Sequence, residues 1–211
     1  MTAAPAFEIY QRVPGLVLGF HGCDESVGED VLQGATRHLN HSSNDYDWLG
    51  RGIYFWENDP NRAWEFAEEA SRATHLTKGS IRKPFVLGAV IDLGLCLNLQ
   101  DRKGLQEVEN AYELLAVAHD LAGGSMPQNK GDALAARYLD CAVLEFLHST
   151  REVLNKRKGS VGNYPPYDTT RAAFPEDDPL YDGAGFRRKN HVQISVRNVA
   201  CIKGYFRPIP G

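Results

Sequence analysis

Three short segments of the sequence combine polar or aromatic side chains with glycines in patterns suited to holding a small ligand. The first is GFHGCD, in which His21 and Gly22 follow the apolar run at residues 16–20. A glycine there lets the backbone approach a ligand closely, while the imidazole can reach the ligand from one side. Taken alone, a histidine at the end of a strand is more often a structural residue.

The second segment is WLGRGIYFW, in which Gly50 and Gly52 precede Tyr54. A tyrosine beside glycines offers a flat face for stacking and a hydroxyl for hydrogen bonding. The alternative is ordinary core packing, and we assign the neighbouring Trp48 and Trp56 to that role.

The third segment is HVQISV near the end of the chain. Strand alternation places His191, Gln193 and Ser195 on one face and the apolar residues on the other. Such a face either binds a ligand or is exposed to solvent.

The elements that position these segments can be predicted from periodicity and caps. We expect strands at residues 16–20, 52–56, 85–91, 96–99, 191–196 and 199–206, with 96–99 pairing with 85–91. Asp24 and Asp59 are suited to cap two helices, the second with Pro60 at its first position. Longer helices are expected near residues 105–121 and 134–148, and residues 159–185 are expected to lack regular structure. This order predicts an α+β fold with a mainly antiparallel or split sheet, in one domain over residues 1–211.

The order of the three segments resembles the ADP-ribosyltransferase superfamily, in the branch of the poly(ADP-ribose) polymerases and diphtheria toxin. The resemblance rests on HG at 21–22, GRGIYF at 50–55 and the final strand pair. The chain is also similar to uncharacterised bacterial proteins with YDWLGxGIYFWE and a late HxQI. The resemblance implies a split antiparallel sheet with flanking helices and a helical insertion. It also implies NAD as co-substrate and no metal.

The resemblance assigns roles to individual residues. It places His21 against the ribose next to adenine, the backbone of Gly22 against the nicotinamide carboxamide, and Tyr54 on the nicotinamide ring. Gly52 is expected to leave room for that planar ligand. By count, the second wall of the slot falls on Glu65, so Phe66 or Trp64 is expected to supply it instead. Arg171 is a candidate partner for the NAD pyrophosphate, or a solvated loop arginine.

Gln193 occupies the position of the family's catalytic glutamate, and an amide cannot act as a base near neutral pH. Three explanations remain open. The acceptor can itself be nucleophilic, the protein can bind NAD or ADP-ribose without transfer, or another carboxylate can serve. The candidate carboxylates are Asp168, Glu176, Asp177, Asp178 and Asp182.

Composition sets the cellular context. The net charge of −4 gives no global attraction for nucleic acid, although the basic run at 187–189 keeps an RNA or DNA acceptor open. No apolar run is long enough to span a membrane, no secretory signal is visible, and the four cysteines lack paired spacing, so we expect a cytoplasmic protein.

The expected function is that of a bacterial NAD-dependent mono-ADP-ribosyltransferase, a glycosyltransferase acting on NAD. It would be a toxin or defence effector that modifies a protein or nucleic acid, with a possible antitoxin partner. A non-catalytic NAD-binding module and an NAD hydrolase are the alternatives.

Overall fold

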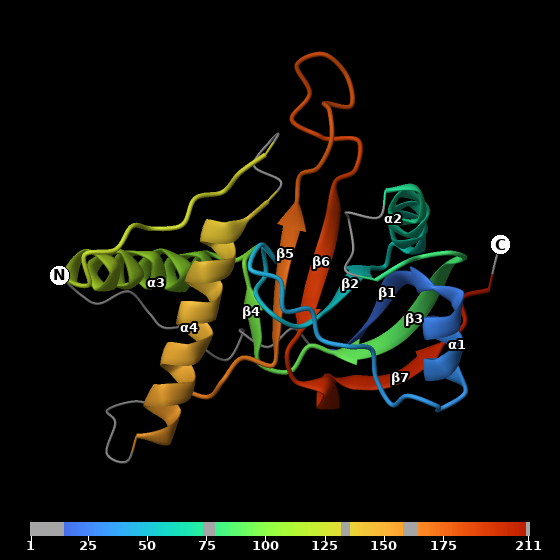
Figure 1. Cartoon of the computed structure of the whole chain (residues 1–211), viewed down its shortest axis with the longest axis horizontal. Helices are drawn as coiled ribbons and strands as arrows, with labels where there is room; N and C mark the ends of the chain where they lie inside the picture. Colours follow the sequence, from blue (N-terminus) through green and yellow to red (C-terminus); the bar gives the residue numbers. More distant parts are fainter. Residues whose placement is uncertain (1–14, 74–78, 132–135, 158–163, 210–211) are drawn as a thin grey trace.

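The fold is built around one mixed sheet, seen in a computed structural model that describes residues 15–73, 79–131, 136–157 and 164–209. These residues form a seven-stranded sheet and four helices (Figure 1), which confirms the α+β class. The strands are β1 (Leu16–Asp24), β2 (Ile53–Glu57), β3 (Pro84–Asp92), β4 (Cys96–Asn98), β5 (Thr169–Phe174), β6 (His191–Val196) and β7 (Ile202–Phe206). The helices are α1 (Glu25–Leu32), α2 (Pro60–Arg72), α3 (Arg102–Leu121) and α4 (Tyr138–Lys156), and a short 3-10 turn (Val199–Cys201) precedes β7.

The first two helices begin where local chemistry predicts. Asp24 accepts a hydrogen bond from the backbone N–H of Ser26 at the start of α1. Asp59 accepts one from the backbone N–H of Arg62, and Pro60 occupies the first turn of α2. Both caps satisfy donors that have no partner within the helix. The predicted starts of these two helices are therefore confirmed.

The sheet has the order β4-β5-β6-β2-β1-β3-β7, and its neighbours are antiparallel except for β4 and β5. β1 pairs with β3 along its whole length, from Leu16 to Asp24. Between β1 and β2 the register pairs are only Gly19↔Glu57 and Phe20↔Trp56. We call this short junction the β1–β2 seam. It divides the sheet into a half containing β4, β5, β6 and β2 and a half containing β1, β3 and β7.

The helices cover the sheet unevenly. α1 and α2 both pack against β1 and β3, but on opposite faces, because they contact residues of opposite alternation. α3 and α4 pack together and cover β4 and β5 through the cluster around Leu97, Leu144 and Ala172. α2 and the α3–α4 pair share the face that carries Trp56 and Gln193. β2 and β6 therefore lie between two helical walls (Figure 1).

Four predicted elements differ from the structure. The predicted strand at 199–206 begins with the 3-10 turn Val199–Cys201, and only Ile202–Phe206 is a strand. The strand at 96–99 does not pair with 85–91, because both edges of β3 are taken by β1 and β7 and β4 pairs with β5 instead. The region 159–185 contains a strand, β5, whose Thr169 and Thr170 are fully buried. Finally, α4 begins at Tyr138 and runs to Lys156, later and further than predicted. The α3–α4 insertion itself lies between β4 and β5 in the chain.

Candidate functional site

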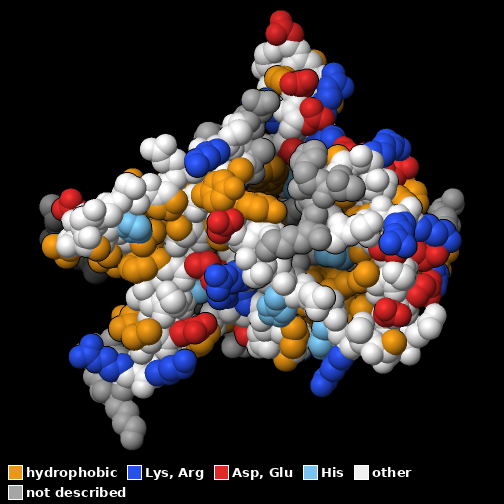
Figure 2. All heavy atoms as spheres, viewed as in Figure 1, with side chains coloured by type: hydrophobic (Ala, Val, Ile, Leu, Met, Phe, Trp, Pro, Cys, Tyr) orange, Lys and Arg blue, Asp and Glu red, His pale blue; other side chains and the backbone are white. Residues whose placement is uncertain are grey.

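A cavity of about 610 Å³ lies over β2 and β6, between α2 and the α3–α4 side of the sheet. Its volume falls in the range of small-molecule sites. Six of the seven predicted site residues line it, although they come from distant parts of the chain: His21, Gly22, Gly52, Tyr54, Phe66 and Gln193. Figure 2 shows hydrophobic side chains gathered on the viewed face over the beginning of α4 and over β5.

His21 bridges the sheet where the β1–β2 seam opens. Its Nδ1 lies 2.7 Å from the carbonyl oxygen of Tyr54. A carbonyl can only accept, so Nδ1 carries the proton and Nε2 is left as an acceptor. Burial lowers the pKa of His21, which keeps the imidazole neutral. The ring is therefore a fixed hydrogen-bond acceptor at the cavity wall.

Tyr54 presents its ring to the cavity while its hydroxyl is used by the preceding loop. The hydroxyl donates to the carbonyl of Gly50 at 2.7 Å and accepts from the backbone N–H of Leu49 at 3.0 Å. Burial raises the pKa of Tyr54 well above its usual value. The hydroxyl thus shapes the loop, and the aromatic face is what Tyr54 can offer a ligand.

Gln193 is held by Trp48 across the cavity. Trp48 Nε1 donates to Oε1 of Gln193 at 2.5 Å, and the indole lies 4.6 Å from the Phe174 ring between centroids. All three residues line the cavity. The prediction that Trp48 and Trp56 only pack is therefore incomplete, because both tryptophans also line the cavity.

The glycines are required by the protein itself. A Cβ on Gly22 would lie 2.2 Å from the carbonyl oxygen of Ala63 in α2. A Cβ on Gly52 would lie 2.3 Å from Oγ of Ser195. Both distances are impossible for real atoms, so close packing explains these glycines without a ligand. Gly22 brings α2 against β1, and Gly52 brings β2 against β6.

Phe66 is the aromatic residue of α2 that reaches the cavity. Its ring lies 5.1 Å from that of Trp56 between centroids. Trp64 is 44% exposed, and Glu65 is also exposed. Of the two alternatives for the second wall, the geometry favours Phe66.

Arg171 does not line this cavity. It pairs with Ile194 in the β5–β6 register, whereas Gln193 pairs with Ala172, so the two side chains emerge on opposite faces. Its guanidinium binds the carboxylate of Glu57 through Nε at 2.5 Å and Nη2 at 2.9 Å. The position of Arg171 therefore gives no support to a contact with a ligand in the cavity.

Three further charged or titratable residues meet at the same cavity, and of these the sequence singled out Glu176, as a candidate carboxylate, and His191, on the polar face of its strand. Arg62 of α2 donates through Nη2 to both carboxylate oxygens of Glu176, at 2.8 and 2.9 Å. Glu176 Oε2 also lies 3.5 Å from Nδ1 of His191. Burial lowers the pKa of His191, and its Nδ1 lies 2.8 Å from the carbonyl of Lys189. Of the five loop acids named as candidate carboxylates, Glu176 is the one that lines this cavity.

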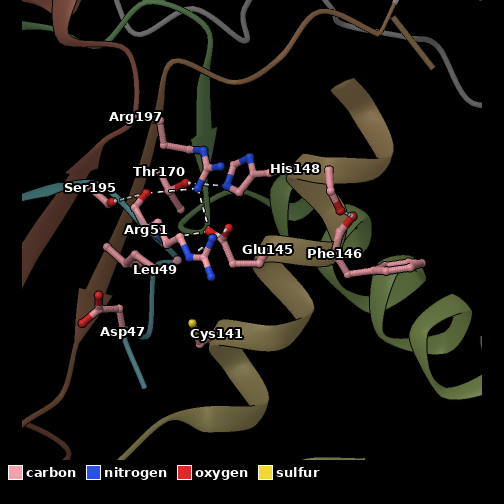
Figure 3. Close-up of polar contacts among 12 residues, drawn as sticks. Asp47, Leu49, Arg51, Cys141, Glu145, Phe146, His148, Thr170, Ser195 and Arg197 are labelled. Carbon is pink, nitrogen blue, oxygen red and sulfur yellow. Dashed lines mark hydrogen bonds and ion pairs between the residues drawn. The ribbon is translucent and has the colours of Figure 1, made fainter. Parts of the chain in front are cut away.

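A second polar cluster lies between α4 and β5 and does not line this cavity (Figure 3). Glu145 of α4 accepts from the backbone N–H of Arg51 and from Nη1 of Arg197, both at 2.7 Å. His148, one helical turn further, lies 3.3 Å from Oγ1 of Thr170 through Nε2. These contacts tie α4 to the loop before β2 and to the end of β6. The cluster therefore holds α4 against the sheet.

Comparison of the chain with protein-family models, curated proteins and solved structures finds no match. None of the helices in the described part of the chain is long and apolar enough to cross a bilayer. Within the same residues, no three His, Cys, Asp or Glu side chains are grouped as a metal site would require. The assignment of function therefore depends on the cavity.

Proposed function

We propose that the cavity binds NAD and that the protein is an NAD-dependent mono-ADP-ribosyltransferase with an ADP-ribosyltransferase-like split sheet. The observation that carries the proposal is the convergence of His21, Tyr54, Phe66 and Gln193 around one cavity of suitable size. These residues lie on three strands and a helix, and only the folded chain brings them together.

The geometry is compatible with the role of each residue. Nε2 of His21 is available to accept from a ribose hydroxyl, because Nδ1 donates to Tyr54. The rings of Tyr54 and Phe66 supply apolar faces for nicotinamide. Gln193 Oε1 is engaged by Trp48, so its amide N–H groups are the donors left for a ligand.

In the proposed reaction the bond between nicotinamide nitrogen and ribose C1′ breaks, and nicotinamide leaves with the electron pair. An oxygen or nitrogen of a macromolecular acceptor forms the new bond to C1′ and loses a proton to solvent or to a base. Gln193 can orient the ribose but cannot take that proton near neutral pH. A protein or nucleic-acid acceptor that is already nucleophilic suits such a site, as does a toxin or defence role in the bacterial cytoplasm, with an antitoxin as a possible partner.

One observation favours a second candidate, a module that binds NAD or ADP-ribose without transferring it. The side chain at the catalytic position is an amide locked by an indole, and the carboxylate of Glu176 is occupied by Arg62. A site without an available base can bind well and react slowly. Simple NAD hydrolysis lies between these two functions, because NAD is cleaved but ADP-ribose passes to water and not to a macromolecule.

Incubation with adenine-labelled NAD in a cell extract separates these functions. Label on a macromolecule establishes transfer, free ADP-ribose alone establishes hydrolysis, and intact NAD with measurable binding establishes the module. Tyr54→Phe keeps the ring and should keep NAD binding, whereas Tyr54→Ala should lose it. Unchanged affinity in a folded Tyr54→Ala variant, or no NAD binding by the wild type, contradicts the proposal.

A further inference from the structure

Arg62 is buried beside the cavity with most of its hydrogen-bonding capacity unused. The residue is 6% exposed, and both oxygens of Glu176 contact a single nitrogen, Nη2. Among the described residues, Nε and Nη1 have no hydrogen-bond partner. The same is true of the buried Nε1 of Trp56, whose ring centre lies 5.6 Å from the guanidinium carbon. Three buried donor nitrogens thus lie together without an acceptor.

Such donors are costly to bury unless something accepts from them. All three nitrogens can only donate hydrogen bonds, and the guanidinium of Arg62 carries a full positive charge. The ligand that satisfies them is an anion with several oxygens, and phosphate groups match the planar guanidinium well. An apolar ring or a cation would leave the same donors unpaired.

Arg62 and Glu176 differ in how firmly they are held. Arg62 lies in the capped first turn of α2, and its backbone N–H is bound by Asp59. Glu176 follows β5 in the loop that projects beyond the sheet in Figure 1, and its side chain is 31% exposed. Glu176 is therefore the partner that can exchange, while the arginine stays in place.

We propose that Arg62 and Trp56 form a phosphate subsite of the cavity, and that the Glu176 carboxylate occupies it until a ligand phosphate displaces it. The proposal rests on the proposed NAD function, since the pyrophosphate of NAD is the group that enters. Lys189 keeps its own bond to Glu69 at 2.6 Å. The exchange therefore moves the Glu176 side chain without detaching the base of the loop.

The probe is ADP, which carries a pyrophosphate and no nicotinamide, and its affinity is measured by calorimetry. Arg62→Gln should weaken ADP binding about tenfold or more, because it removes charge-assisted hydrogen bonds. Glu176→Gln should strengthen ADP binding several-fold, because the competing charge is gone. Arg62→Lys should restore only part of the affinity, since it lacks the planar fork.

The decisive result is that Arg62→Gln weakens ADP binding while Glu176→Gln strengthens it. If the pair is only structural, both substitutions weaken ADP binding or neither changes it, and the subsite is overturned. Thermal unfolding of each variant, and of the Arg62→Gln/Glu176→Gln double variant, shows that the folded protein is being compared.

Parallel titrations with NAD separate this inference from the proposed function. NAD binding that needs Tyr54 but ignores Arg62→Gln keeps the proposed function and overturns the subsite. If the wild type does not bind NAD, but ADP affinity falls in Arg62→Gln and rises in Glu176→Gln, the subsite is supported and the NAD function is contradicted.

Discussion

Trp48 and Gln193 lie 145 positions apart in the chain, and a 2.5 Å hydrogen bond joins the indole Nε1 to the amide oxygen. An indole N–H can only donate, so the side-chain atom facing it must be the oxygen of the amide. One contact thereby fixes the orientation of the Gln193 side chain, which we propose lies at the catalytic position.

The first prediction concerns this contact. Trp48→Phe keeps an aromatic ring against Phe174 but removes the N–H, so Gln193 loses its fixed orientation. We expect NAD affinity to fall several-fold and the free energy of unfolding to fall by about 1 kcal/mol. Calorimetry and urea unfolding measure the two effects. Trp64→Phe, at the 44% exposed tryptophan of α2, is the matched control and should change neither.

Gln193→Glu should keep NAD binding and raise the rate of nicotinamide release. The carboxylate can still accept from Trp48, and it places negative charge beside the developing ribosyl cation. An effect of about 3 kcal/mol, or roughly a hundredfold in rate, is the scale for one preorganised electrostatic group. A single-turnover assay checks it. Equal or slower release, with NAD still bound, would show that charge at this position is not what limits the reaction.

Gly22→Ala should destabilise the protein by about 2 kcal/mol, because the new methyl group collides with the carbonyl of Ala63. The collision pushes α2 from β1 and with it Arg62 and Phe66, so NAD affinity should fall as well. Chemical denaturation gives the stability change. Gly204→Ala, where a Cβ meets nothing within 4 Å, should leave the free energy of unfolding nearly unchanged. A similar loss of stability in both variants would mean that replacing any glycine is destabilising, and that the contact between α2 and β1 is not the cause.

Acid should destabilise the fold partly through His148. Burial, and then the charges of Arg197 and Arg151, lowers the pKa of His148 from 6.5 to about 3. The unfolded chain therefore binds the proton first. The stability contributed by neutral His148 is complete above pH 6.5 and is lost as pH falls from there toward 3, by roughly 1.4 kcal/mol per pH unit.

His148→Gln should flatten that part of the stability curve while keeping a partner for Thr170. Its stability near neutral pH should be lower than that of the wild type, and the difference should shrink as the solution is acidified. Urea unfolding at several pH values measures this. His119→Gln on α3 is the control; an unchanged slope in His148→Gln would contradict the assignment.

Local signals made much of the fold predictable. Asp24 and Asp59 define helix starts through contacts within three residues, and the alternation in residues 191–196 defines β6. These caps and this strand depend on neighbours in the sequence, where pattern and structure coincide. The six predicted site residues that line one cavity come from distant segments, and they were expected to meet only because of the resemblance.

The rest depends on contacts that the sequence does not display. β5 was missed because its strand character comes from burial between β4 and β6, and the partner of β4 is chosen by which edges are already occupied. Arg62 and Glu176 are 114 positions apart, as are Glu57 and Arg171. Only the fold determines which carboxylate each arginine meets. The available signal for Arg62 was a basic residue in the first turn of a well-capped helix, close in the sequence to Trp56, Trp64 and Phe66.

Few backbone contacts join the two halves of the sheet at the β1–β2 seam. Two residue pairs, the hydrogen bond from the Asn58 N–H to the carbonyl of Leu18 and the imidazole of His21 link the two halves across this junction, whereas β1 pairs with β3 along its whole length. A ligand that contacts both His21 and Tyr54 adds contacts between β1 and β2 across this seam. Part of its binding free energy then resists separation of the halves, so occupancy of the cavity and cohesion of the whole sheet rise together.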